Sequence, residues 1–340
     1  MIQKVSIENA VGMVLAHDLT KIIPKEYKGA PFKKGYIIKE EDIEPLKKMG
    51  KYHINIIQID EKRLHEEEAA YAIGMAAAGE GISLTKPSEG KVSLKANAKG
   101  LLKINKKLLE AVNEIDDIIL STRHTHTIVE ANQIVAGTKV IPLVIEKDKI
   151  TRVKKILEKE EPMVSIKPLM PLKVGIVVTG TEVYTGKIED KFGQVLVDKA
   201  KDMGGIPFDV LFAPDEEDKI TQCIHRHLEQ GADLVMVSGG MAVDADDVTP
   251  NAIEKVSTEV ISYGSPVLPG AMFMMAYRKD IPILGIPACG MFSKITVLDL
   301  ILPRVFAKDK INKKDIISLA HGGLCLNCER CTYPVCPLGK

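Results

Sequence analysis

Three aspartates crowd into one short loop that otherwise has the composition of an anion site. Gly239 and Gly240 follow an apolar run, as in loops that cradle phosphates, and Asp244, Asp246 and Asp247 come shortly afterwards. Two carboxylates about 4 Å apart repel by about 4 kcal/mol at an effective dielectric of 20, so the three either point apart into water or share a cation. Mg²⁺ accepts one or two protein oxygens and completes its shell with water and phosphate. The loop therefore predicts a phosphate held through Mg²⁺, or else a solvated acidic turn in which Asp247 caps the next helix.

Four of the six cysteines lie in the last sixteen residues. Cys325, Cys328, Cys331 and Cys336 have the spacing C-x2-C-x2-C-x4-C. In a reducing compartment such a cluster indicates metal binding before disulfides. A structural Zn²⁺ site and an iron–sulfur cluster both fit this spacing, and both alternatives stay open at this point.

The elements that must position the aspartate loop alternate between strand and helix. Strands are expected at 173–178, 206–212, 232–237, 259–264, 272–277 and 282–286, and helices at 192–203, 215–231, from 249 onward and at 293–306. This pattern predicts an α/β fold with a mostly parallel sheet in three layers. Ligands bind beyond the carboxyl ends of such strands, where the loops that start at Thr179, Ser238 and Pro287 should gather.

The first half of the chain has a different pattern, which predicts an N-terminal mixed α+β accessory region. Helices are expected at 40–49, 63–78 and 106–113, among short alternating strands. Prolines 162, 168 and 171 mark the boundary into the α/β domain. The expected domains are a small mixed or β unit at 1–60, an accessory α+β region at 61–165, the α/β domain at 172–307 and a cysteine-rich tail at 315–340.

Composition excludes several functional classes. The 46 basic residues balance the 46 acidic residues, which disfavours nucleic acid as a partner because its binding depends on clustered positive charge. No apolar stretch approaches the roughly 20 residues that span a bilayer, so no membrane partner is expected. The N-terminus lacks the pattern of a secretory signal, and we expect a cytoplasmic location.

The common nucleotide fingerprints are missing, and a different ordered set of loops takes their place. Residues 175–182 are not G-x-G-x-x-G, and Gly186-Lys187 is followed by Ile188 where a P-loop has Ser or Thr. The loops lie at 178–190, 212–218, 238–250 and, in two parts, 263–270 and 284–290. Taken in order, they resemble the molybdopterin-binding domain shared by molybdopterin adenylyltransferases and molybdopterin molybdotransferases, of the MogA and MoeA type, over residues 172–306.

The resemblance implies roles for particular residues. Asp247, Glu182 and Asp190 would be catalytic, placing Mg²⁺ against a phosphate. The residues implied in cofactor binding lie in the same loops: Thr179, Gly180, Thr181, Asp215, Ser238, Gly239, Gly240, Asp244, Pro269, Gly270 and Pro287. The glycine pair would let a phosphate or pterin edge approach the backbone, although tight turns need glycine without any ligand.

The chain departs from the family pattern at several of these positions. Lys191 and Phe192 stand where the family has Ser and Asn, and residues 268–272 lack both lysines of the family's loop. Those lysines would supply positive charge for a phosphate or for molybdate. The missing charges favour pterin binding over metal insertion.

Three functions follow as alternatives. The first is Mg²⁺-dependent handling of molybdopterin or its adenylate by a molybdotransferase-like enzyme. The second is a non-catalytic carrier or maturation factor that uses the tail to reach a molybdenum enzyme. The third is a nucleotide pyrophosphatase or deamidase, since the same domain occurs in competence-damage-inducible proteins. A homo-oligomer is expected in each case.

Overall fold

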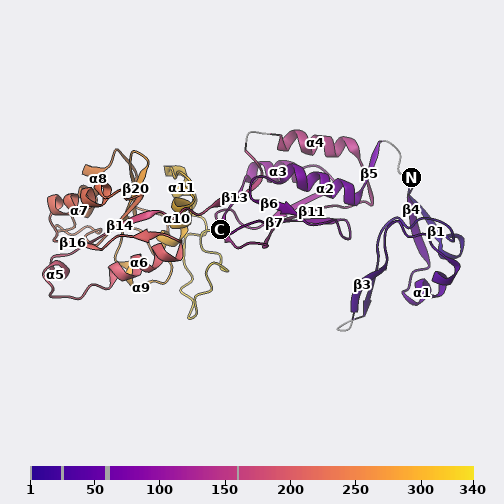
Figure 1. Ribbon diagram of the computed structural model, residues 1–340, viewed down its shortest axis with the longest axis horizontal. Coiled ribbons are helices and arrows are strands. Elements are labelled where there is room, and N and C mark those ends of the chain that lie inside the picture. Colours follow the sequence, from indigo (N-terminus) through magenta and orange to yellow (C-terminus); the bar gives the residue numbers. More distant parts are fainter. Residues whose placement is uncertain (1, 24–26, 58–61, 159–160) are drawn as a thin grey trace. The chain divides into compact units, whose positions relative to one another are not determined.

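A computed structural model describes residues 2–23, 27–57, 62–158 and 161–340 (Figure 1). The described chain forms two compact units. The first comprises Met1–Ala98, Leu102–Thr125 and Val129–Ile166, and the second comprises Lys99–Leu101, His126–Ile128 and Lys167–Lys340. Within the described ranges, no helix is long and apolar enough to cross a membrane.

The first unit contains two separate apolar clusters, one of which lies within residues 5–56. The elements of this part are β1 (Ile2–Ser6), η1 (Ile7–Asn9), β2 (Leu19–Ile23), β3 (Tyr27–Phe32), η2 (Glu40–Asp42), α1 (Ile43–Lys48) and β4 (His53–Ile57). β1 pairs antiparallel with β4, and β2 with β3. The helix expected at 40–49 is divided into η2 and α1, because the Asp42 carboxylate accepts a hydrogen bond from the Lys39 backbone N–H and holds a separate tight turn.

The second cluster of the first unit is packed between an antiparallel sheet of order β6-β7-β11-β9 and helices. The elements between residues 63 and 168 are β5 (Arg63–His65), α2 (Glu66–Ala77), β6 (Ile82–Leu84), β7 (Lys91–Ala96), β8 (Gly100–Ile104), α3 (Lys106–Asn113), β9 (Ile118–Thr122), β10 (Ile128–Val129), β11 (Ile134–Val140), β12 (Val144–Glu146), α4 (Lys147–Leu157) and β13 (Val164–Pro168). The helix at 106–113 is confirmed. The helix expected from residue 63 begins three residues later, because 63–65 pair with β12 as a strand.

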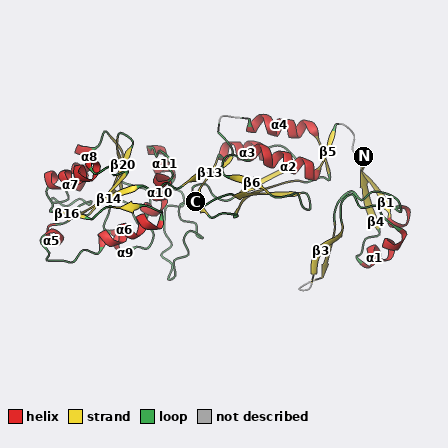
Figure 2. Cartoon of the chain, viewed as in Figure 1, coloured by secondary structure: helices red, strands yellow, loops and turns green. Residues whose placement is uncertain are grey.

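A seven-stranded sheet forms the centre of the second unit (Figures 1 and 2). Its order is β15-β14-β17-β20-β19-β18, and β16 also pairs with β14. The strands are β14 (Lys173–Thr179), β15 (Ile206–Pro207), β16 (Leu211–Ala213), β17 (Leu234–Ser238), β18 (Glu259–Tyr263), β19 (Met274–Arg278) and β20 (Ile281–Ile286). Only the pairings of β19 with β18 and β20 are antiparallel. The mostly parallel sheet is confirmed.

Helices cover both faces of this sheet. They are α5 (Thr181–Tyr184), α6 (Phe192–Asp202), α7 (Glu217–Glu229), α8 (Thr249–Val256), α9 (Cys289–Phe292), α10 (Val297–Phe306) and α11 (Lys313–Ser318). Leu234 and Met236 of β17 belong to the core cluster that contains α6 and α10 side chains, whereas Val235 and Val237 belong to the cluster that contains α7 and α8 side chains. A strand buried on both faces is continuously apolar, which explains the sequence of β17 and confirms the three-layer α/β fold.

Helix α8 begins at Thr249, as the sequence predicts. Val248 takes its cap position without a side-chain cap hydrogen bond, so Asp247 is not the helix cap of the alternative prediction. The Thr249 hydroxyl lies 3.2 Å from the Thr179 hydroxyl in the buried interior, so it joins the start of α8 to the end of β14.

Candidate functional site

The carboxyl ends of the central strands lie side by side in the sheet. Val178 of β14 is in register with Ser238 of β17, which is in register with Ile286 of β20. On the other side, Thr179 is in register with Ala213 of β16. The loops after these strands therefore start along one edge of the sheet, as the sequence predicted, and we call this group of loops the strand-end site.

The first loop of the strand-end site is tied to the loop after β16. The Thr181 backbone N–H and hydroxyl donate to the Asp215 carboxylate at 2.8 and 3.0 Å. The Asp215 backbone N–H donates back to the Thr181 hydroxyl at 3.3 Å. Gly180, with a φ of 138°, makes the turn that brings Thr181 there. Glu182 follows with an exposed side chain.

Asp190 stabilises the start of α6. Its carboxylate accepts hydrogen bonds from the backbone N–H groups of Phe192 at 2.8 Å and Gly193 at 3.0 Å. A Cβ at Gly193 would lie 2.4 Å from the same carboxylate, so the glycine allows this close approach. A carboxylate at a helix start is stabilised by the unpaired N–H groups and by the helix dipole. Asp190 therefore has a structural role here, whatever part it takes in catalysis.

Gly239 and Gly240 bring the third loop against the first. Both have positive φ, 93° and 56°. A Cβ on Gly239 would lie 2.4 Å from the Thr179 backbone oxygen, and one on Gly240 would lie 2.8 Å from the Thr249 hydroxyl. Only glycine satisfies both the backbone conformation and this spacing. The pair is thus required by the fold, and it also leaves the loop backbone without side chains.

The three aspartates of this loop have different surroundings. Asp244 and Asp246 are exposed, whereas Asp247 is partly buried. The Asp247 carboxylate accepts a hydrogen bond from the Asp244 backbone N–H at 3.0 Å, and the Asp247 N–H donates to the Asp244 backbone oxygen at 3.0 Å. The second carboxylate oxygen of Asp247 faces Gly240, 3.7 Å from where its Cβ would be. The loop therefore presents one oriented carboxylate beside the glycine backbone and sends the other two into water.

Tyr263 and Ser238 are two further polar groups in this area. The Tyr263 hydroxyl donates to the backbone oxygens of Met241 at 2.9 Å and Ala242 at 3.1 Å, and so holds the aspartate loop from β18. Burial raises the pKa of this hydroxyl, and the nearby Asp247 charge adds to the rise. The Ser238 hydroxyl is fully buried and has no hydrogen-bond partner in the described chain. Sequence reasoning missed Tyr263, because no local pattern links it to a loop twenty residues earlier.

The remaining predicted residues fall into two places. Pro287 follows β20 at the strand ends, and its oxygen accepts from the Gly290 N–H at 2.9 Å as α9 begins. Gly270, with a φ of 132°, packs against Val297, where a Cβ would lie 2.5 Å from the side chain. Pro269, in contrast, lines a separate cavity together with the tail cysteines.

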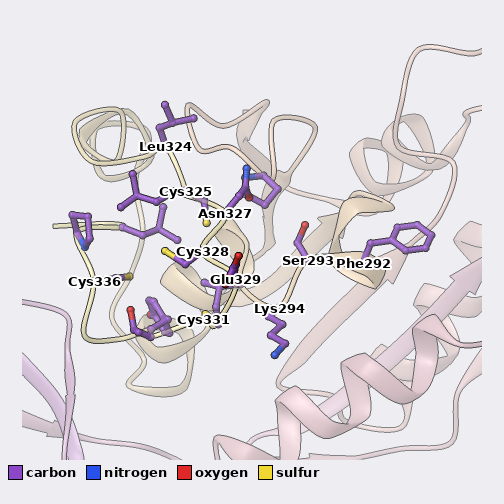
Figure 3. Close-up of a pocket in the computed structure, with 17 residues that line it drawn as sticks. Phe292, Ser293, Lys294, Leu324, Cys325, Asn327, Cys328, Glu329, Cys331 and Cys336 are labelled. Atoms are coloured by element: carbon purple, nitrogen blue, oxygen red, sulfur yellow. The ribbon is translucent and has the colours of Figure 1, made fainter.

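That cavity has a volume of about 300 Å³ and is lined by all four cysteines of the tail (Figure 3). Cys325 and Cys336 are partly buried, Cys328 and Cys331 are exposed, and none forms a disulfide. Residues 292–295 supply another part of the wall. Across the described ranges, no three His, Cys, Asp or Glu side chains lie close enough together to hold a metal ion. The four thiols share a cavity without converging on a single point, and the aspartate loop likewise forms no ready-made ion site.

Comparison with protein families bears directly on the segment that builds the strand-end site. A family described as "Probable molybdopterin binding domain" matches residues 175–307. The matched segment contains Thr179, Asp190, Asp247 and Pro287, and so spans every loop of the site. Residues 4–58 match a second family, described as a domain of unknown function.

Curated relatives align over a short part of the chain. A CinA-like protein of Mycobacterium tuberculosis is 34% identical over 83 residues, which is 24% of this chain and 19% of the relative. A CinA-like protein of Mycolicibacterium gilvum is 35% identical over 86 residues, 25% of this chain and 20% of the relative. The chain thus spans about a fifth of the length of these relatives.

Solved structures with distant similarity include two biosynthetic proteins and one CinA. The molybdopterin biosynthesis enzyme MoaB of Thermus thermophilus covers 42% of this chain and 98% of its own, with 18% identity and a TM-score of 0.37. The molybdopterin biosynthesis Mog protein of Mycobacterium ulcerans covers 39% and 94%, with 19% identity and a TM-score of 0.35. The protein CinA of Thermoplasma acidophilum covers 39% and 97%, with 16% identity and a TM-score of 0.33.

Proposed function

We propose that the strand-end site binds molybdopterin or its adenylate, with Mg²⁺ between a phosphate of the ligand and Asp247. The observation that carries this proposal is the loop after β17. In it, a glycine pair without side chains lies beside one oriented, partly buried carboxylate. The domain family of this segment is described as binding molybdopterin, which supports the same ligand.

Each part of the loop has a physical task in this proposal. The backbone at Gly239 and Gly240 gives a flat surface that a phosphate or pterin edge can approach closely. Asp247 contributes one carboxylate. Mg²⁺ typically binds one or two protein oxygens, and water and phosphate oxygens complete its coordination shell. When bound, Mg²⁺ would neutralise charge on the phosphate. Tyr263 keeps the loop in place through its two hydrogen bonds.

A molybdotransferase-like reaction is our first choice, with Glu182 as the exposed second carboxylate. In such a reaction water cleaves the phosphoanhydride bond between AMP and the pterin phosphate, which releases AMP, while molybdate supplies the metal to the pterin. Asp190 would then position α6, since backbone N–H groups already occupy its carboxylate.

A non-catalytic carrier is the second candidate, and one observation favours it. The segment at 268–272 contains no lysine, and Leu268 is 54% exposed where the related loops carry positive charge. A site without that charge can hold the pterin but attracts molybdate poorly. A nucleotide pyrophosphatase or deamidase stays a third proposal, tested for the first activity with nucleotides that contain a pyrophosphate bond and for the second by ammonia release from nucleotides that contain a carboxamide.

The decisive experiment measures pterin binding with and without Mg²⁺. Asp247→Asn keeps a side-chain acceptor for the Asp244 N–H but removes the charge, so it should weaken Mg²⁺-dependent binding by about tenfold, or about 1.4 kcal/mol. Asp246→Asn, which changes an exposed carboxylate of the same loop, is the matched control and should bind like the native protein. If both variants bind the pterin with equal affinity in the presence of Mg²⁺, the loop is a solvated acidic turn and not a Mg²⁺ site.

Turnover then separates the candidates. With adenylylated molybdopterin, Mg²⁺ and molybdate, release of AMP supports the transferase, and tight binding without AMP release supports the carrier. Absence of any pterin binding by the native protein rejects both.

A further inference from the structure

The cysteine tail is a closed loop anchored in the core of the second unit. The Gly339 N–H donates to the Gly322 backbone oxygen at 2.9 Å, which joins the two ends of the loop. Leu338 is buried, 4% exposed, in the core cluster that contains α6 and α10 side chains. The Tyr333 hydroxyl donates to the backbone oxygen of Asp299 in α10 at 3.2 Å. Although residues 319–340, the part of the tail after α11, form no helix or strand (Figure 2), these contacts fix the two ends of the loop and one point between them.

The tail is also hydrogen-bonded to the loop that follows β18. The Leu268 N–H donates to the Gly323 oxygen at 2.8 Å, and the Cys325 N–H donates to the Leu268 oxygen at 2.8 Å. A Cβ on Gly323 would lie 2.4 Å from the Pro266 oxygen, so the two segments are in close contact. Cys325 therefore lies directly beside the backbone of a loop that contains two of the predicted cofactor-binding residues, Pro269 and Gly270.

The four cysteines line one cavity (Figure 3). Two of them are held against the core, and the other two are exposed. Cys325 and Cys336 pack against the core cluster and are the fixed pair. Cys328 and Cys331 are exposed on the intervening segment, in which no residue from 326 to 333 belongs to a helix or strand. The thiols of such a segment can move toward the fixed pair without disturbing the sheet.

We propose that these four cysteines bind a thiolate-seeking metal centre, either one Zn²⁺ ion or a small iron–sulfur cluster, and that the bound metal stiffens the loop at 265–270. Thiolate ligands select zinc and iron–sulfur clusters over hard ions such as Mg²⁺. Metal binding to a segment that is not yet arranged around the ion contributes its free energy to ordering that segment. Because Cys325 is hydrogen-bonded to Leu268, ordering the tail also restrains the adjacent loop. An effect of this stiffening on pterin binding would rest on the proposed function, whereas the metal site and the stiffening do not.

Metal content tests the first half. The full chain is purified without oxygen, and its zinc, iron and sulfide contents and its visible absorption spectrum are measured. We expect about one metal centre per chain, colourless with zinc or coloured with an iron–sulfur cluster. The double variant Cys328→Ser/Cys331→Ser should lose it, whereas Cys223→Ser, in α7 outside the tail, should retain it. A native protein without metal even after incubation with zinc, or with iron and sulfide, overturns the site, as does equal metal content in the double variant.

Amide hydrogen exchange tests the second half in the absence of any pterin. Removing the metal with a chelator should speed exchange at Leu268 and Cys325 by about tenfold or more, the signature of a local opening made about 1.4 kcal/mol easier. Exchange in β14 should not change. An unchanged Leu268 amide overturns the coupling of tail and loop. Failure of pterin binding, in contrast, rejects only the proposed function, because neither measurement here uses the pterin.

Discussion

The strand-end site and the cysteine tail belong to one compact unit but are built in opposite ways. At the strand ends, parallel strands in register set the positions of the loops, and hydrogen bonds such as those of Asp215 and Asp247 then orient single carboxylates. In the tail, a few hydrogen bonds and one buried leucine hold a segment without secondary structure. The sheet thus fixes the loops of the first region, whereas the thiols of the second do not converge in the described structure and, on our proposal, would be brought together by a metal.

The largest effect should come from a substitution in the strand-end site. Gly239→Ala places a Cβ 2.4 Å from the Thr179 oxygen at a φ of 93°. We expect the free energy of unfolding to fall by about 3 kcal/mol, from backbone strain and overpacking together, as measured by urea denaturation. Gly186→Ala is the control: its φ is 72° but nothing lies within 4 Å, so it should cost only about 1 kcal/mol. Equal losses would show that the contact with Thr179 does not hold the loop.

A substitution that separates the tail from its neighbouring loop should have a smaller effect. Gly323→Ala puts a Cβ 2.4 Å from the Pro266 oxygen. Local opening of the tail should become easier by about 2 kcal/mol, which limited proteolysis would detect as faster cleavage after residue 322, while the sheet stays intact. Leu326→Ala, at a side chain 66% exposed in the same segment, should be cleaved like the native protein. Cleavage of the Gly323 variant at the native rate would mean that the tail is held by other contacts.

The stability of the second unit should depend on pH through one buried histidine of α7. His227 is fully buried, its Nε2 lies 3.0 Å from the Ile176 oxygen, and burial lowers its pKa from the ordinary 6.5. Below pH 6.5 the imidazole of His227 therefore binds a proton more readily in the unfolded chain than in the folded chain. This contribution to stability is complete above pH 6.5 and is lost as the pH falls below it, by at most about 1.4 kcal/mol per pH unit.

Urea denaturation of the native protein and of His227→Gln between pH 7.5 and 5 would measure this slope. Glutamine can donate to the same oxygen but does not titrate, so the part of the slope due to His227 should disappear in that variant. A slope that persists unchanged would assign the pH dependence to other groups.

The smallest effect on stability is expected at Tyr263, which is hydrogen-bonded to the start of the aspartate loop. Tyr263→Phe removes both hydrogen bonds to the backbone of residues 241 and 242 and should cost about 1 kcal/mol of stability, measured by thermal unfolding. Pterin affinity should fall with it, because the loop that carries Asp247 becomes less restrained. Tyr184→Phe, at a side chain 55% exposed, is the control and should change neither quantity. Loss of pterin affinity in both variants would argue against a specific role of the Tyr263 hydrogen bonds in holding the aspartate loop.

Features encoded by neighbouring residues were predicted well from the sequence. The continuous apolar run of β17, the helix at 106–113 and the glycine pair after a buried strand all follow from local patterns. The role of Asp190 at the start of α6 could also be predicted, because aspartate is common just before a helix, where its carboxylate accepts hydrogen bonds from the first N–H groups. The family resemblance implies a catalytic role for the same residue.

Features that depend on distant pairing could not be predicted. Nothing near Tyr263 indicates that it bonds residues 241 and 242, and nothing near Pro269 indicates that residues 323–325 pair with its neighbour. For this reason Pro269 was grouped with the strand-end residues, although it lines the cavity of the tail.

The two short strands beside β14 have a consequence for how the length of the segment before Asp215 can vary. β15 pairs with Lys173 and Val174, and β16 pairs with residues 177–179, one residue out of register with β15. Between these pairings β14 has two residues, 175 and 176, whereas the neighbouring segment has three, 208–210, so deleting one of the three would leave both pairings in place and make the register continuous. Deleting two residues there would instead shift β16 by one position and exchange the faces of Phe212, 40% exposed, and Ala213, 1% exposed, because strand side chains alternate between faces. The loop that carries Asp215 should therefore tolerate the loss of one residue at 208–210 but not of two.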